Sequence, residues 1–411
     1  MNNQPSVERE RLLRVLSLAT FLIFFQAYMV APLIPRLSGV FGVSAQFIGL
    51  MVPAYLIPYG ASTLFYGLIS DRLGRRPIMF ASLIAFVLLT ALTATARSAR
   101  AMIWWRLFTG VGASGVVPLA LALMGDLFPY EQRGRPLGWL FGAMAGGMAF
   151  GSTVGVLVEP FIGWRMLFVS VAIAGAAILA VLLPYRAAMG IEVAKARLRV
   201  AEVFSGYLGL FGSRRGARTY TYVLLNAVFH SGVYTWLGLY FARRFGLGEV
   251  GIGLALLGYG VPGWLMGPLI GRAADRWGRR WLVPAGLAVA ATSAASLIAK
   301  MPLLAAALAV TALSLGYDMT QPLLAGIVTS LDSKRGGQAM GLNVFMLFTG
   351  FGVGSFLFGA VLRWGFGAAL GAFCAIQIVA ALAALALFRS ETASRLERHA
   401  PLTQASGLST P

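Results

Sequence analysis

The sequence predicts an all-α membrane protein whose twelve transmembrane helices form two pseudo-symmetric halves of six helices each. Its composition is 58% hydrophobic and only 11% charged, whereas a soluble domain carries about 25% charged residues. Apolar stretches of about 20 residues, the length needed to cross a bilayer, recur along the whole chain. A charged motif also occurs twice, half a chain apart. With so little polar surface, the protein needs lipid as its solvent.

The apolar stretches define the expected helices in order. Twelve of them are long enough to span a membrane: 13–35, 46–70, 78–97, 101–124, 135–158, 165–184, 219–241, 250–273, 281–300, 302–330, 337–361 and 366–388. A basic segment interrupts the series after the sixth. The chain is therefore expected to contain an N-terminal half (1–184), a linker loop (185–218), a C-terminal half (219–388) and a tail (389–411).

The basic residues lie mainly in alternate loops between the expected spans. Since Lys and Arg concentrate in cytoplasmic loops, this pattern predicts a multi-pass protein of the cytoplasmic membrane with both termini in the cytoplasm. The net charge of +19 is then a sign of topology, and we expect no binding of nucleic acid.

The duplicated motif supports two related halves. Residues 67–76 and 271–280 both read G-x-x-x-D-R-x-G-R-R, and the same offset of 204 residues pairs Tyr55 with Tyr259. Because each half holds an even number of spans, the halves run in the same direction and are related by an axis along the membrane normal.

The twelve spans, the central linker and the paired motif resemble the major facilitator superfamily over nearly the whole chain. In that family the motif loop latches the halves in the outward-open state, which implies a latch between Asp71, Arg75 and Asp126. The full expected latch set is Gly67, Asp71, Arg72, Gly74, Arg75, Asp126, Gly271, Asp275, Arg276 and Arg279. The simpler alternative is that the arginines are only topology signals.

Arg106, in the fourth expected span, begins an R-x-x-x-G-x-G pattern that resembles a family motif associated with proton transfer. An arginine cannot itself deprotonate, so this resemblance implies that it acts on a nearby acid or binds an anionic group. The alternative is that Arg106 lies close enough to the membrane surface to extend its guanidinium into water.

Asp318 is the acid placed nearest the middle of an expected span. An isolated carboxylate in a membrane is costly, so we expect Asp318 to be neutral or paired, and a functional candidate. The alternatives are a purely structural pair with an arginine and contact with water through a cavity.

His230 lies in a polar stripe of the seventh expected span, because Asn226, His230 and Tyr234 recur every four residues. Spans 1, 4, 7 and 10 line the central cavity in the family, which implies that Gln26, Arg106, His230 and Asp318 face one another. A simple interhelical hydrogen bond is the alternative role for His230.

These considerations give two sets of candidate residues. For proton coupling they are Asp318, Arg106 and His230. For substrate binding they are Gln26, Tyr28, Tyr55, Tyr59, Asn226, Tyr234, Tyr259, Gln321 and Asn343.

The glycines of the fifth expected span, Gly147, Gly151 and Gly155, recur every four residues and predict close helix packing. They partly resemble the motif of the drug and proton antiporter branch, although Ser152 stands where that motif usually has proline.

The resemblance implies a secondary transporter that works by alternating access, with proton-coupled export of a small amphipathic or drug-like molecule. Proton-coupled uptake of an organic anion or sugar and a transporter-like membrane sensor or scaffold are the alternatives. Phosphate-loop and metal-ligand spacings are missing from the sequence, so an enzyme is not expected. The expected partners are substrate, protons and lipid, with no cofactor or metal, and the expected state is a monomer.

Overall fold

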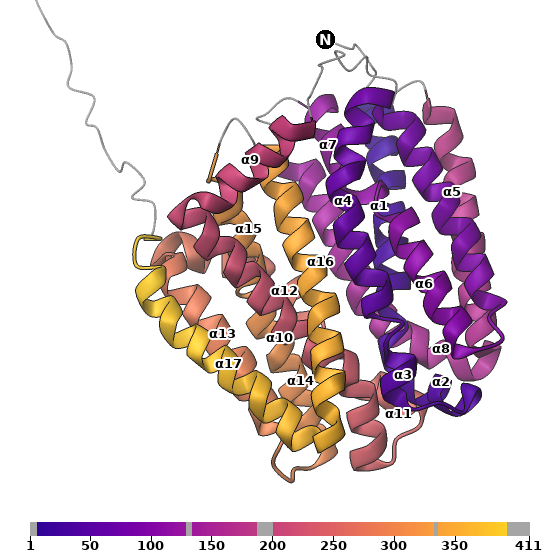
Figure 1. Cartoon of the computed structure of the whole chain (residues 1–411), viewed down its shortest axis with the longest axis vertical. Helices are drawn as coiled ribbons and strands as arrows, with labels where there is room; N and C mark the ends of the chain where they lie inside the picture. Colours follow the sequence, from indigo (N-terminus) through magenta and orange to yellow (C-terminus); the bar gives the residue numbers. More distant parts are fainter. Residues whose placement is uncertain (1–5, 129–133, 187–199, 333–335, 393–411) are drawn as a thin grey trace, which may run out of the picture.

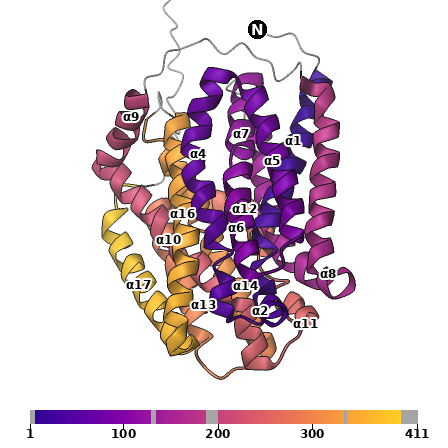
Figure 2. The same ribbon diagram turned by 45° about the vertical axis from the view of Figure 1, so that its right-hand side comes forward.

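The computed structural model describes residues 6–128, 134–186, 200–332 and 336–392, and every regular element in these ranges is helical. Figures 1 and 2 show the earlier helices, coloured indigo to magenta, on one side of the bundle and the later ones, red to yellow, on the other. We call residues 6–186 the N-terminal group and residues 200–392 the C-terminal group.

The N-terminal group contains α1 (Ser6–Tyr28), η1 (Ala31–Leu33), α2 (Ile34–Phe41), α3 (Ala45–Gly49), α4 (Pro53–Leu73), α5 (Arg75–Ala94), α6 (Ala99–Ala113), α7 (Val116–Leu127), α8 (Gly134–Leu182) and η3 (Leu183–Arg186). Within α8, Gly163 has a φ of 77° and divides the element into two helices. The expected spans 135–158 and 165–184 lie on either side of this glycine.

The C-terminal group contains α9 (Val200–Gly212), α10 (Arg214–Phe245), α11 (Glu249–Ala255), α12 (Val261–Trp277), α13 (Arg279–Ser296), α14 (Leu303–Asp318), α15 (Gln321–Thr329), α16 (Gly336–Val361), η4 (Leu362–Trp364) and α17 (Phe366–Leu387). Most of the described part of the expected linker 185–218 is the helix α9, and the expected tail is described only as far as residue 392.

Eight helical segments of the described chain are long and apolar enough to cross a membrane. They are Glu8–Phe41, Ala45–Tyr66, Arg75–Ala94, Ala99–Met124, Gly138–Arg186, Leu303–Thr329, Gln338–Trp364 and Phe366–Leu387. The expected spans 219–241, 250–273 and 281–300 are also helical, but they are not among the eight. The all-helical membrane fold is thereby confirmed, and the number twelve stays a prediction.

Five of the expected spans are interrupted within their length. The interruptions fall at residues 29–30, 50–52, 114–115, 256–260 and 319–320. Prolines at the first turns of α2, α4, α12 and α15 favour the start of a new helix there. The apolar pattern runs through these breaks, so hydropathy alone does not predict them.

The expected glycine face of the fifth span packs against α1. A Cβ atom on Gly147 would lie 2.4 Å from the carbonyl oxygen of Phe21, and one on Gly151 would lie 2.5 Å from that of Phe25. Since no side chain fits at these positions, the glycines are required for the close approach of α1 and α8.

The two groups meet closely at the end of the bundle that holds α2, α3 and α11, which we call the distal end. Trp236 of α10 projects between Gly49 of α3 and Gly359 of α16, where a Cβ atom would lie 2.5 Å and 2.4 Å from the indole. The Trp236 indole nitrogen also donates to the carbonyl of Ser355 at 3.0 Å. A bulky ring from one group is therefore fitted against the backbone of the other.

An ion-pair cluster at the distal end also joins the two groups. The Nε of Arg36 in α2 lies 3.3 Å from Oε1 of Glu159 in α8 and 3.8 Å from Oε1 of Glu249 in α11. Glu159 is buried, whereas Arg36 is half exposed. One arginine thus contacts an acid from each group.

At the opposite, terminal end, where α1 begins and α17 ends, Glu391 fastens the end of α17 to the start of α10. Arg215 donates two hydrogen bonds to its carboxylate, at 2.8 and 2.9 Å, and Arg218 donates a third. Burial acts to raise the pKa of Glu391, but the hydrogen bonds and charges of the two arginines outweigh it and hold that pKa below its ordinary value.

The expected latch loops lie at the terminal end. Gly74 and Gly278, between α4 and α5 and between α12 and α13, have φ values of 91° and 81°, which glycine tolerates best. The side chains of Asp71, Arg72, Asp126 and Asp275, and the surroundings of Gly67, lie outside the described residues. The latch therefore stays a prediction.

Replacing Gly110 by alanine should weaken the contact between α6 and α4. A Cβ atom there would lie 2.2 Å from the carbonyl oxygen of Tyr55, so the helices would have to separate, at a cost of about 1–3 kcal/mol. We expect a lower unfolding temperature in detergent. Gly371→Ala on α17, which meets no atom within 4 Å, is the matched control, and equal stability of the two variants would contradict this packing.

Candidate functional site

Arg106 of α6 is completely buried, and its guanidinium is surrounded by neutral oxygen atoms. It donates to Gln26 Oε1 at 2.8 Å, to the carbonyl of Met51 at 3.3 Å and to that of Ala27 at 3.3 Å. The guanidinium carbon also lies 4.1 Å from the ring centroid of Tyr55, a cation–π contact. The alternative that Arg106 extends to the membrane surface is therefore wrong.

Helix breaks explain why these carbonyls accept from a side chain. Since α1 ends at Tyr28, Gln26 and Ala27 lie in its last turn, where carbonyls lack partners within the helix and the helix dipole is negative. Met51 lies in the break between α3 and α4. Within the described chain, Arg106 thus donates to the carbonyls of Gln26, Ala27 and Met51 and forms no ion pair.

His230 of α10 lies among tyrosines of the C-terminal group. Its Nε2 shares a hydrogen bond with the hydroxyl of Tyr259, and its ring stacks on Tyr317 with 3.8 Å between centroids. Tyr234 in turn stacks on Tyr259 at 4.4 Å. Nδ1 of His230 is buried and has no hydrogen-bond partner in the described chain, so one nitrogen remains for a ligand or a proton.

Asp318 is the last residue of α14, directly before the break that separates it from α15. Its carboxylate accepts a hydrogen bond from Ser314 at 3.3 Å and lies against Gly263 of α12, where a Cβ atom would come within 2.7 Å of Oδ1. Within the described residues, no basic side chain pairs with it. Asp318 is thus held by weak polar contacts next to a break in the helix.

A cluster of rings joins these positions across the two groups. We call it the aromatic bridge, and its members are Tyr28, Tyr55, Tyr59, Tyr234, Tyr259, Tyr317, Phe348 and Phe351. Tyr59 of α4 stacks on Phe348 of α16 at 4.3 Å, and Tyr28 of α1 lies 5.6 Å from Tyr234 of α10. The bridge therefore connects Tyr55, which stacks on Arg106, with the tyrosines around His230.

Several buried polar atoms of the candidate substrate-binding residues have no hydrogen-bond partner in the described chain. They are the hydroxyls of Tyr28, Tyr55 and Tyr59, Nε2 of Gln26, both amide atoms of Gln321 and Oδ1 of Asn343. Each such group costs about 1–3 kcal/mol. The bridge therefore combines flat apolar faces with donors and acceptors that a small amphipathic molecule can satisfy.

Of the four polar residues expected to face one another, Gln26 and Arg106 are in direct contact, and no described contact joins His230 to Asp318. His230 instead stacks on Tyr317, the neighbour of Asp318, in the C-terminal group. Their joint role in coupling stays a prediction.

Asn226, expected in the same stripe as His230, lies apart from the aromatic bridge. Its amide donates to Thr320 at 2.8 Å and accepts from Gln377 of α17 at 3.3 Å. Both ends of the amide are thus occupied by contacts that brace the α14–α15 break, and its role in substrate binding is untested.

Tyr317, Phe348 and Phe351 are central to the bridge but were not candidates from the sequence. Tyr317 directly precedes Asp318, and the two phenylalanines are three residues apart on α16. These weak signals are common in apolar helices, so only the packing reveals their position.

Membrane-length helices with ionisable residues buried among them define a multi-pass membrane protein. The sequence profile described as Major Facilitator Superfamily matches residues 16–266 and 241–409. The chain belongs to this superfamily and is a transporter, not an enzyme.

Two relatives and one solved structure illustrate what this chain is similar to. The uncharacterized MFS-type transporter YwfA of Bacillus subtilis is 26% identical over 391 residues, 94% of this chain and 93% of that protein. A chloramphenicol resistance protein of Pseudomonas aeruginosa is 30% identical over 141 residues, only 34% of each protein. The crystal structure of a D-xylose–proton symporter superposes with a TM-score of 0.74 at 17% identity, covering 91% of this chain and 96% of that one. That last likeness concerns the fold alone.

Replacing Arg106 by glutamine should destabilise the N-terminal group, because the carbonyls of Ala27 and Met51 lose a charged donor. We expect a loss of about 1.5–3 kcal/mol, measured as a lower unfolding temperature in detergent. Arg106→Lys should recover only part of it, since an ammonium lacks the planar fork of donors. Arg100→Gln, at an exposed position of the same helix, is the control, and an Arg106→Gln variant as stable as this control would refute the interpretation.

Proposed function

We propose that this transporter exports a small amphipathic molecule in exchange for protons, with Asp318 as the proton carrier. The main support is the position of Asp318. Its carboxylate has no basic partner in the described chain, and it lies next to Tyr317 of the aromatic bridge and directly before a helix break.

The physical reason lies in the cost of burying charge. A charged Asp318 needs solvent or more donors than Ser314 supplies, whereas the neutral acid is tolerated in an apolar surrounding. Protonation therefore shifts the relative stability of two conformations that differ in how well they hydrate this carboxyl. In this proposal Arg106 holds the N-terminal half in shape, and His230 contacts Tyr259 and Tyr317 of the aromatic bridge.

The aromatic bridge is the proposed substrate site. Its ring faces favour an apolar scaffold, and the unpartnered hydroxyls of Tyr28, Tyr55 and Tyr59 favour a molecule with several polar groups. The name of the Pseudomonas relative, a chloramphenicol resistance protein, supports export of a drug-like molecule as the direction.

We also propose that the chain has twelve spans in two halves of six helices. The halves are residues 1–184 and 219–388, joined by the linker 185–218 and followed by the tail 389–411. The terminal end would face the cytoplasm, since the basic loops gather there and Lys and Arg favour that side. The protein would act as a monomer in the cytoplasmic membrane.

The contacts of Arg36 indicate at which end of the bundle the two groups are closed against each other. It joins Glu159 of the N-terminal group to Glu249 of the C-terminal group at the distal end, beside the Trp236 contact. We infer a state closed to the outside, whereas the expected latch of Asp71, Arg75 and Asp126 would stabilise the opposite state.

Removing the contact between Arg36 and Glu249 should open the distal end more often. In a Cys374→Ser background, Val30→Cys places a thiol at the buried break of α1. With Glu249→Gln, we expect labelling of this thiol by an impermeant maleimide from outside to rise by about two- to fivefold. The rise is small because a partly exposed ion pair contributes little free energy. Arg243→Gln, exposed at the same end, is the control, and unchanged labelling with Glu249→Gln would count against this closure.

The coupling proposal is tested in proteoliposomes with an imposed pH gradient. A panel of drug-like molecules is screened with the wild-type protein and with Asp318→Asn, which mimics the permanently neutral acid. We expect the variant to retain exchange of substrate and to lose accumulation driven by the gradient. Asp332→Asn, at the terminal end, is the control, and equal gradient dependence in Asp318→Asn and the wild type would rule out Asp318 as the carrier.

Proton-coupled uptake of an organic anion is the second candidate. The buried, permanently charged Arg106 has only neutral partners in the described chain, and a carboxylate would complement it. The sign of gradient-driven transport separates the two: accumulation against the proton flow supports export, and accumulation with it supports uptake.

A further inference from the structure

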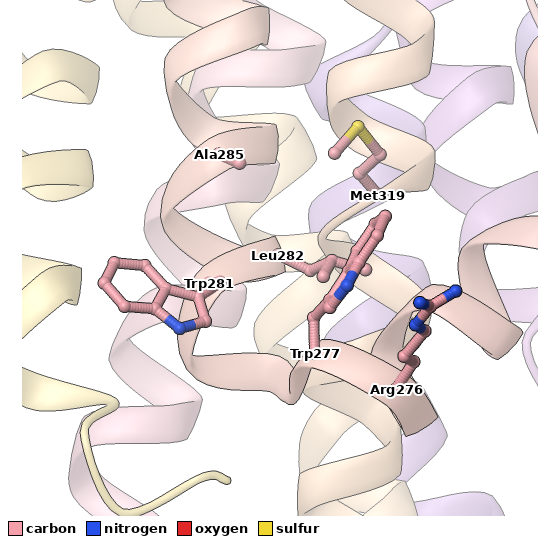
Figure 3. Close-up of a pocket in the computed structure, with 6 residues that line it drawn as sticks. All are labelled: Arg276, Trp277, Trp281, Leu282, Ala285 and Met319. Atoms are coloured by element: carbon pink, nitrogen blue, oxygen red, sulfur yellow. The ribbon is translucent and has the colours of Figure 1, made fainter. Parts of the chain in front are cut away.

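A groove opens on the outer surface of the C-terminal group at the terminal end. It has a volume of about 560 Å³ and is lined by Arg276, Trp277, Trp281, Leu282, Ala285 and Met319. Figure 3 shows the ring of Trp277 standing between Arg276 and Leu282, with Met319 above it. The groove thus lies between the end of α12, the start of α13 and the break that follows α14.

The lining changes from basic and aromatic to apolar along the groove. Arg276 is exposed and forms no ion pair within the described chain, and the indoles of Trp277 and Trp281 are 58% and 53% exposed. The guanidinium of Arg280 adds a second positive charge over Trp281, at 5.0 Å from the ring centroid. Leu282, Ala285 and Met319 form the apolar part.

This order matches the order of groups in a phospholipid. In membrane proteins, exposed tryptophans lie at the level of the lipid headgroups, and basic pockets between helices bind anionic headgroups. A phosphate can accept from Arg276, while an acyl chain covers Met319. The volume also lies within the range of about 300–1,000 Å³ that is usual for small-molecule sites.

We propose that this groove binds one anionic phospholipid. Its net negative charge complements Arg276 and Arg280, whereas a zwitterionic lipid also carries a cation, which these arginines repel. Because Met319 lines the groove and directly follows Asp318, the bound acyl chain contacts the break between α14 and α15.

Brominated lipids test the proposal, because bromine quenches only nearby tryptophans. The purified full chain is reconstituted in vesicles of phosphatidylcholine and phosphatidylglycerol at fixed proportions, with bromine on one lipid or on the other. We expect more quenching per mole from brominated phosphatidylglycerol. Trp277→Phe combined with Trp281→Phe should remove this excess.

Charge variants show whether the arginines cause the preference. Arg276→Gln with Arg280→Gln should weaken the relative binding of phosphatidylglycerol on the order of tenfold, and the matching Lys variants should retain it. The control is Arg363→Gln, because Arg363 stacks on Trp364 in the same manner, at 4.0 Å, at the distal end. All variants are compared by unfolding temperature, and the Lys variants keep the test valid if the Gln pair folds poorly.

Three results would overturn the proposal. They are equal quenching by both brominated lipids, an excess that persists without the two positive charges, and an excess that inorganic phosphate abolishes. The last result would mean a site for free anions.

Discussion

The fold depends on satisfying backbone carbonyls that helix breaks leave unpaired inside a membrane. Water is not available in the apolar layer, so each open carbonyl needs a donor from the protein. Arg106 supplies that donor to Ala27 and Met51, and it also holds the side chain of Gln26. One buried guanidinium therefore fixes how α1, α4 and α6 meet, and Tyr55 is positioned by stacking against it.

The C-terminal group solves the same problem with neutral side chains. Thr320 at the α14–α15 break is held by Asn226, which is itself held by Gln377. Asp318, two residues before Thr320, is not part of this network and keeps a weak contact with Ser314. The group thus has a helix break held by hydrogen bonds and, beside it, a carboxyl outside that network, which supports the proposed coupling role of Asp318.

The sequence predicted several parts of this arrangement well. The membrane-length helices and the close-packing glycines follow from composition and local sequence pattern. It did not predict the partners of Arg106, because backbone carbonyls leave no mark in the sequence. It also grouped Asn226 with His230 by their helical spacing, although the two contact different helices.

The sequence by itself determined the environment of the chain, its helical elements and its family, because hydropathy and glycine content act locally along the chain. Only the tertiary structure decided where the helices break, how Trp236 closes the distal end, and that rings from both groups join into one aromatic bridge. These features arise from contacts between residues far apart in the chain. Their energies depend on distance in space, which the order of residues does not specify.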